Sequence, residues 1–250
     1  MLPIDSVDEG ELGKNIRSFY TLGSTTNPEN QKSLEYLNSI VKRLQRFKKK
    51  PFDYEVRILQ SECPNAMALP GGVIVVTSGL LKTMKSESEL VSVLAHEMGH
   101  IELSHCFDSV KYEILTKKLV HSSLGAIADF SRNLLIQHSF SKTQEDEADS
   151  YGFQLLVNSE YDPSAMAKAF RNLKEASGRQ NDGPPNPIRD YFMSHPPLDQ
   201  RMSKFSSEAQ TWWSGKTTER RYIGVENLKE KSDLSLKDFG ETEWIMKFSN

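Results

Sequence analysis

The sequence has little cysteine, with two residues among 250. A disulfide-dense scaffold or a zinc finger built from cysteine alone needs more, so both classes are excluded. It also lacks an excess of one charge: 31 Lys and Arg face 34 Asp and Glu, for a net charge of −3. Because no overall basic field would attract a polyanion, we expect no nucleic-acid partner.

Long apolar runs are missing as well. No stretch approaches the roughly 20 apolar residues that a membrane-spanning helix needs, so no transmembrane segment is expected. The first residues, Met1 to Asp5, do not show a basic region followed by an apolar core. A cytosolic protein would begin this way, and so would a chain that has lost its signal peptide. With 37% hydrophobic and 26% charged residues, the composition is typical of a globular protein and not of a disordered chain.

Hydrophobic spacing and capping residues predict a mainly helical chain with a small sheet. Residues 54–59 alternate and residues 73–76 are β-branched, so both are predicted strands. Helices are predicted over 28–49, 86–105, 121–138, 143–157, 162–177 and 196–210. The composition of residues 178–187 predicts a loop. We expect the polar segment after Gly215 to be a weakly structured peripheral extension.

The segment His96-Glu97-Met98-Gly99-His100 carries the chemistry. On a helix, His96 and His100 lie on one face, one turn apart, so both imidazoles can reach one Zn²⁺ ion. Glu97 points beside that ion, where a carboxylate can take a proton from a water molecule. Apolar flanks predict that this helix is buried, and a chance match would more often lie on a polar face. These flanking residues are Leu90, Val91, Val93, Leu94, Ile101 and Leu103.

A catalytic zinc site usually takes a third protein ligand and leaves one position for water. The residues alone leave six candidates: His105, Cys106, His121, His138, Glu145 and Glu147. His105 is rotated away from the face that His100 shares. Glu145 and Asp149 share a face of another predicted helix, so one could bind metal while the other orients a histidine. Glu147 points elsewhere and is interpreted as a solvated carboxylate.

Four segments in this order resemble the M48 family of zinc metallopeptidases. In chain order they are a strand segment over 65–81, the zinc helix 96–100, a third-ligand helix over 141–149 and a late motif over 194–201. Lys142 stands where the family usually has arginine. The resemblance covers residues 65–201. It implies an α+β fold: a mainly helical zincin-type domain with a small β-sheet beside the zinc helix. We expect residues 1–214 to form this single domain, and residues 215–250 to be a polar C-terminal extension.

The resemblance also implies roles for single residues. Glu145 would be the third metal ligand, and Asp149 would orient a ligating histidine. His195 would face the metal from the opposite wall, where it would stabilise an oxyanion or, in a latent state, cap the metal. Arg201 would brace the site, with an ordinary structural salt bridge as the alternative.

The residues Gly71, Gly72, Val73, Ile74 and Val75 have two interpretations. The simpler one is a core strand. The functional one is an edge strand to which an extended substrate adds through main-chain hydrogen bonds, with the glycines permitting close approach.

The resulting hypothesis is a zinc-dependent endopeptidase that holds one Zn²⁺ per chain and cleaves extended or misfolded polypeptides. One alternative is a latent, chaperone-like or quality-control binding protein in which His195 caps the zinc. A purely structural zinc would leave Glu97 without a purpose. The resemblance implies a bacterial periplasmic or cell-envelope location with a signal-bearing or membrane-anchored precursor, and the cytoplasm is the alternative. Cys63 and Cys106 could form a disulfide or remain thiols.

Overall fold

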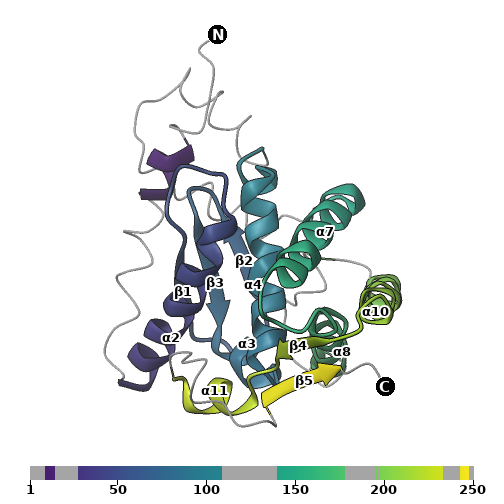
Figure 1. The fold of residues 1–250 in the computed structure, drawn as a ribbon. Helices are drawn as coiled ribbons and strands as arrows, with labels where there is room; N and C mark the ends of the chain where they lie inside the picture. Colours follow the sequence, from purple (N-terminus) through teal and green to yellow (C-terminus); the bar gives the residue numbers. More distant parts are fainter. Residues whose placement is uncertain are drawn as a thin grey trace.

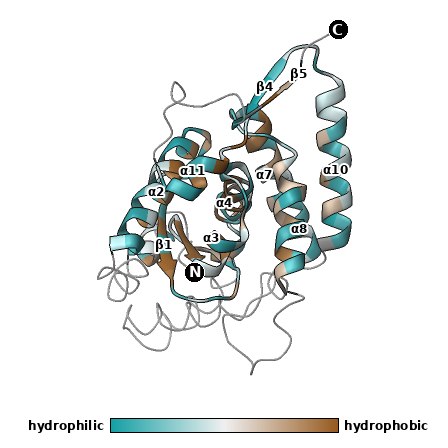
Figure 2. Ribbon diagram, turned by 90° about the horizontal axis from the view of Figure 1, so that it is seen from below, coloured by the Kyte–Doolittle hydropathy of each residue, from teal (hydrophilic) through white to brown (hydrophobic). Residues whose placement is uncertain are grey.

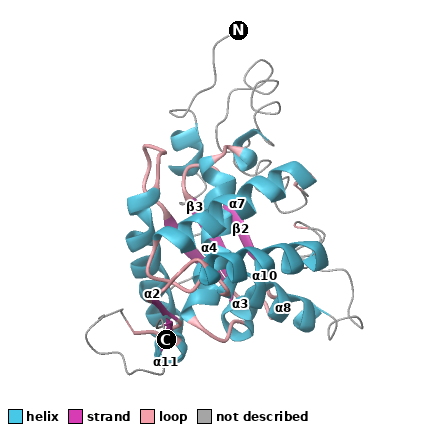
Figure 3. Cartoon of the chain, turned by 45° about the vertical axis from the view of Figure 1, so that its right-hand side comes forward, coloured by secondary structure: helices cyan, strands magenta, loops and turns pink. Residues whose placement is uncertain are grey.

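The computed structural model describes residues 9–14, 28–108, 140–177, 195, 198–232 and 243–247. The predicted helix over 121–138 and the predicted loop over 178–187 lie outside them. The described residues form an α+β fold in which helices surround a small sheet (Figures 1 and 3). Among them, no helix is both long enough and apolar enough to cross a bilayer.

The predicted elements are largely present. The helices are α2 (Pro28–Leu44), η1 (Gln45–Phe47, 3-10), α3 (Ser78–Thr83), α4 (Glu87–Glu102), α7 (Lys142–Asn158), α8 (Ala165–Ser177), α10 (Leu198–Ser214) and α11 (Val225–Glu230). The strands are β1 (Glu55–Leu59), β2 (Ala66–Leu69), β3 (Val73–Thr77), β4 (Glu219–Tyr222) and β5 (Trp244–Lys247). Helix α2 ends at Leu44 and tightens into η1, whereas the sequence predicts an unbroken helix to residue 49. The short elements β2 and α3 were not predicted as separate elements.

The main sheet has three strands in the order β1-β3-β2. Strand β3 pairs in parallel with β1 and antiparallel with β2, and all of its residues are buried. The expectation that residues 71–75 form an edge strand for substrate is therefore wrong, because both sides of β3 are already paired.

Gly71 and Gly72 allow close contacts within the fold. Their φ angles are 77° and 86°, in the left-handed region that glycine adopts without strain. A Cβ atom on Gly71 would lie 2.5 Å from the Cα of Gly13, and one on Gly72 would lie 2.6 Å from the carbonyl oxygen of Asp53. The close approach that glycine permits here is to the protein's own backbone.

The central helix of the fold is α4, which the hydropathy view shows as an apolar core element, while α10 at the periphery is largely hydrophilic (Figure 2). Ser86 caps the first turn of α4 by accepting a hydrogen bond from the N–H of Glu89. Helix α7 packs directly on α4, and Gly99 and Gly152 lie at the contact. A Cβ atom on Gly99 would come within 2.9 Å of the Cα and carbonyl oxygen of Ala148. The glycine therefore sets the close spacing of the two helices.

The segment after Gly215 is not weakly structured where it is described, so that expectation is corrected. Strands β4 and β5 pair antiparallel, and Tyr222 is fully buried. The N–H groups of Glu87 and Ser88 donate to the carbonyls of Gly224 and Ile223, at 2.8 and 2.9 Å. The N–H groups in the first turn of a helix have no partners within the helix. Here residues 223 and 224, from the segment after Gly215, supply the acceptors. The division at residue 214 stays a prediction.

A buried carboxylate, Glu87, also anchors the beginning of α4. It accepts hydrogen bonds from the hydroxyls of Tyr36 and Tyr161, both at 2.7 Å, and from the Nη2 atom of Arg43 at 3.0 Å. Burial raises the pKa of Glu87. This cluster joins α4 to α2 and to the turn before α8.

We predict that Gly99→Ala lowers the free energy of unfolding by about 1–3 kcal/mol, because the added methyl group overpacks the contact between α4 and α7. Urea denaturation measures the change. The matched control is Gly215→Ala, where the nearest atom to the new Cβ lies at 3.6 Å. Equal stability of the two variants would show that Gly99 does not set the helix spacing.

Candidate metal centre and active site

Five polar side chains gather at one buried point between α4, α7 and residue 195. Helix α4 contributes His96, Glu97 and His100, and α7 contributes Glu145. His195 completes the group. None of the five is more than 1% exposed. Glu145 and His195 lie far along the chain from the three residues of α4. The packing of α7 on α4 brings Glu145 to the histidines of α4.

The possible ligand atoms converge. The Nε2 atoms of His96 and His100 lie 3.0 Å apart. The carboxylate of Glu145 lies 3.6 Å from the first of them and 3.3 Å from the second. With a nitrogen of His195, the four possible ligand atoms all lie within 4.8 Å of one another. This is the set that sequence reasoning and resemblance assembled.

Asp149 fixes the protonation pattern of His96. Its Oδ1 atom lies 2.9 Å from Nδ1 of His96. An ionised carboxylate only accepts hydrogen bonds, so Nδ1 carries the proton and Nε2 presents its lone pair to the centre. Burial alone would raise the pKa of Asp149, but the His96 hydrogen bond and the Arg201 charge hold it below its usual value. Asp149 thus lies where the resemblance placed it.

Arg201 links two carboxylates of α7, those of Glu145 and Asp149. Its Nε and Nη2 atoms donate to the oxygens of Asp149 at 2.8 and 2.7 Å, in a bidentate pair. Its Nη1 atom lies 3.0 Å from Oε2 of Glu145 and also donates to the carbonyl of His195 at 2.9 Å. The guanidinium therefore braces three members of the site, which is more than an ordinary salt bridge does.

His195 lies inside the ligand cluster. Its Nδ1 atom is 2.7 Å from Oε1 of Glu145 and 3.3 Å from Nε2 of His96. Its Nε2 atom is 3.7 Å from the carboxylate of Glu97. Burial alone would lower the pKa of His195, but the carboxylates of Glu145 and Glu97 raise it. The charge of His195 and the close contact with the His100 ring outweigh burial and lower the pKa of Glu145.

Two observations show that the site fits a metal cation. Burial lowers the pKa of His100 well below its usual value, so its ring is neutral and can offer a lone pair beside that of His96. Among the described residues, neither carboxylate oxygen of the buried Glu97 has a hydrogen-bond partner, which is costly unless another group meets them. A cation with an attached water molecule would satisfy the imidazole lone pairs and this carboxylate together.

Sequence reasoning missed some neighbours of the site. The ring of Phe140 stacks on His100 with 3.8 Å between ring centroids, and nothing in the sequence signals it. Glu147 was interpreted as a solvated carboxylate, but its Oε2 atom lies 3.1 Å from Nε2 of His105. Cys63 and Cys106 are both thiols, so the disulfide alternative is wrong.

We predict that Arg201→Met destabilises the metal-free protein by about 3–5 kcal/mol, because it leaves buried carboxylates without a compensating charge. Urea denaturation in the presence of a chelator measures this. Lys82→Met, which breaks the exposed Lys82–Glu62 pair, should cost at most about 1 kcal/mol. Equal losses in the two variants would contradict the bracing role.

Comparison with known proteins places this site in a family. The profile of "Peptidase family M48" matches residues 30–209, which contain the whole motif region. Metalloprotease LoiP of Escherichia coli is 30% identical over 190 residues, covering 71% of each chain. Mitochondrial metalloendopeptidase OMA1 of Arabidopsis thaliana is 30% identical over 160 residues, covering 62% of this chain. The chain spans 31% of that relative's length and 45% of the Schizosaccharomyces pombe OMA1. Together with the buried histidine and glutamate cluster, these matches show that the chain belongs to peptidase family M48.

Proposed function

We propose that the protein is a zinc-dependent endopeptidase that cleaves extended or misfolded polypeptides. The observation that carries the proposal is the convergence of two imidazole nitrogens and a carboxylate beside Glu97, a buried carboxylate to which no described residue donates a hydrogen bond. Relatives named metalloprotease and metalloendopeptidase support the same activity.

His96, His100 and Glu145 would hold the metal, and a set of two imidazole nitrogens and one carboxylate oxygen suits Zn²⁺. When bound, zinc would polarise the peptide carbonyl and lower the pKa of a water molecule. Asp149 keeps the proton on Nδ1 of His96, and Arg201 holds the carboxylates of Asp149 and Glu145 in place. These contacts orient the donors before any metal arrives.

Glu97 moves the proton in this mechanism. One of its carboxylate oxygens takes a proton from the attacking water and later delivers it to the nitrogen of the leaving amine. No hydrogen bond from the described part of the chain competes for these oxygens, so both are available for this task. An N–H of His195 would donate to the oxyanion that forms at the scissile carbonyl.

Strand β2 is the better candidate for binding the substrate backbone. In the described part of the chain it pairs only with β3, so one of its sides has no strand partner. It is also the strand of the sheet that packs most extensively on α4, the helix that carries Glu97 (Figure 1). An extended peptide added to β2 would form main-chain hydrogen bonds that a folded chain cannot offer. This arrangement favours unfolded segments as substrates.

A second candidate function rests on the place of His195. Its Nδ1 atom lies among the proposed metal ligands, 3.3 Å from Nε2 of His96. In that position the ring could occupy the coordination site that water needs, which would make the protein latent or leave it a quality-control binding protein. The two functions predict opposite changes in kcat when the imidazole of His195 is removed.

For organisation and location, we propose one peptidase domain over residues 1–214 and a C-terminal extension over 215–250. We propose a bacterial periplasm or cell envelope as its location, with the cytoplasm as the alternative. Relatives from Escherichia coli support the first, whereas the OMA1 relatives are named as mitochondrial proteins.

We predict that Glu97→Gln lowers the rate of casein cleavage about 10²- to 10⁴-fold, because the amide cannot take the proton. The variant should still bind one zinc ion per chain, as metal analysis would show. Glu62→Gln, at an exposed position, is the matched control and should cleave at the wild-type rate. Cleavage by Glu97→Gln at that rate would contradict the role of Glu97, and wild-type protein that binds no zinc would contradict the metal site.

We predict that His195→Ala lowers kcat for a peptide substrate about 10²-fold and changes KM little, because the lost donor acts on the transition state. Steady-state kinetics on zinc-loaded protein measure the split. A rise in kcat would instead favour the latent function, in which His195 blocks the metal.

A further inference from the structure

A line of polar contacts leads from His100 away from the proposed metal position. The Nδ1 atom of His100 lies 3.0 Å from Nδ1 of His105, and Nε2 of His105 lies 3.1 Å from Oε2 of Glu147. The His105 ring is buried, whereas about half of the Glu147 side chain is exposed. The line therefore runs from the centre of the site to the surface of α7.

The backbone is bent to make the first contact possible. Helix α4 ends at Glu102, and Ser104 adopts a φ of 63°, a left-handed conformation that is uncommon for a residue other than glycine. The chain turns back at this point and places His105 beneath His100. Nζ of Lys50 holds the turn by donating to Oγ of Ser104 at 2.6 Å. The unfavourable backbone conformation of Ser104 is thus retained where it brings the ring of His105 into contact with that of His100.

The Glu147 carboxylate at the outer end favours one arrangement of protons, provided that a cation meets Nε2 of His100 and the Glu145 carboxylate at the inner end. With both rings neutral, one proton lies between the two Nδ1 atoms and belongs to either ring. If His105 donated it, the unprotonated Nε2 of His105 would face the Glu147 carboxylate, and two acceptors would oppose each other. If His100 donates it, Nε2–H of His105 donates to Glu147. Only the second arrangement leaves Nε2 of His100 unprotonated beside Nε2 of His96.

We propose that His105 and Glu147 are positioning residues that hold His100 in the tautomer and orientation needed to bind the metal. This inference rests on the proposed metal site. Asp149 acts on His96 directly, whereas Glu147 acts on His100 through the ring of His105. Both carboxylates come from α7, so the helix that supplies the third ligand also orients both histidine ligands of α4.

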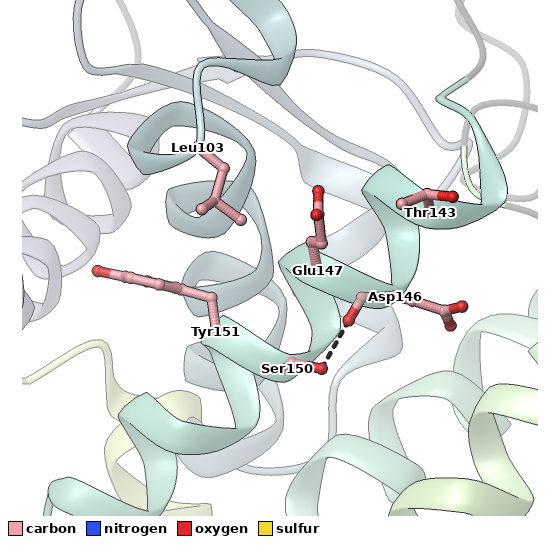
Figure 4. Close-up of a pocket in the computed structure, with 6 residues that line it drawn as sticks. All are labelled: Leu103, Thr143, Asp146, Glu147, Ser150 and Tyr151. Carbon is pink, nitrogen blue, oxygen red and sulfur yellow. Dashed lines mark hydrogen bonds between the residues drawn. The ribbon is translucent and has the colours of Figure 1, made fainter.

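The line of contacts from His100 through His105 to Glu147 is called the relay below, and its outer end is accessible. Glu147 lines a surface pocket at the end of α4 and the beginning of α7, and its side chain leaves α7 in a different direction from that of Asp146 (Figure 4). The pocket is lined by Leu103, Thr143, Asp146, Glu147, Ser150 and Tyr151. Asp146 therefore offers a control: it carries the same charge on the same helix but takes no part in the relay.

The test measures zinc affinity of the full chain by competition with a chromophoric chelator, together with the visible absorption of the Co²⁺-loaded protein. His105→Leu should lose about 10- to 100-fold in affinity, the usual cost of removing a group that orients a metal ligand. His105→Asn should largely restore binding, because its Oδ1 can accept from Nδ1 of His100. Glu147→Gln should bind more weakly than Asp146→Asn and show an altered Co²⁺ spectrum.

Wild-type affinity in a folded His105→Leu protein would overturn the proposal, and so would an equal loss in His105→Asn. If His105→Leu does not fold, identical affinity and Co²⁺ spectra for Glu147→Gln and Asp146→Asn would overturn it. Failure of the wild-type chain to bind zinc at all would instead refute the proposed metal site on which the relay depends.

Discussion

The structure depends on burying a cluster of imidazoles and carboxylates where α4 and α7 cross. Isolated charges in such a place would be very costly, so each group needs a partner. Asp149 accepts a hydrogen bond from Nδ1–H of His96, and Arg201 compensates the charge of Asp149 and Glu145. What remains is two imidazole lone pairs and a carboxylate directed at one another, an arrangement that a cation relieves. The proposed catalytic centre follows from this balance.

Much of the surrounding fold holds α4 still. The Glu87 cluster fixes its first turn to α2, and backbone carbonyls of residues 223 and 224 accept from its first N–H groups. The absence of a side chain at Gly99 lets α7 approach closely enough for Glu145 to meet His100. A segment that looks peripheral by composition thus helps to position a helix whose functional residues lie at its other end.

His195 contacts the groups that would hold and orient the proposed metal. Inside the ligand cluster it can stabilise charge or block access, and its contacts with Glu145 and the Arg201–carbonyl bond tie it to the same groups that orient the metal ligands. The relay through His105 adds a second layer on the other face of His100. In the proposed metal site, these contacts would restrict His96 and His100 to one tautomer each, which is the preorganisation that a metal-dependent hydrolase requires.

The sequence by itself determined most of the longer elements and the residues that carry the proposed chemistry. Helical spacing placed His96 and His100 on one face, Ser86 marked the beginning of their helix, and β-branched residues identified β3. Such features depend on neighbours within a few residues, so local physics suffices to predict them. Only tertiary structure decided that β3 is an internal strand, that Tyr222 is buried, and that Glu147 meets His105. These facts depend on strand order and on contacts between distant segments, and a side chain's polarity says nothing about which distant partner will satisfy it.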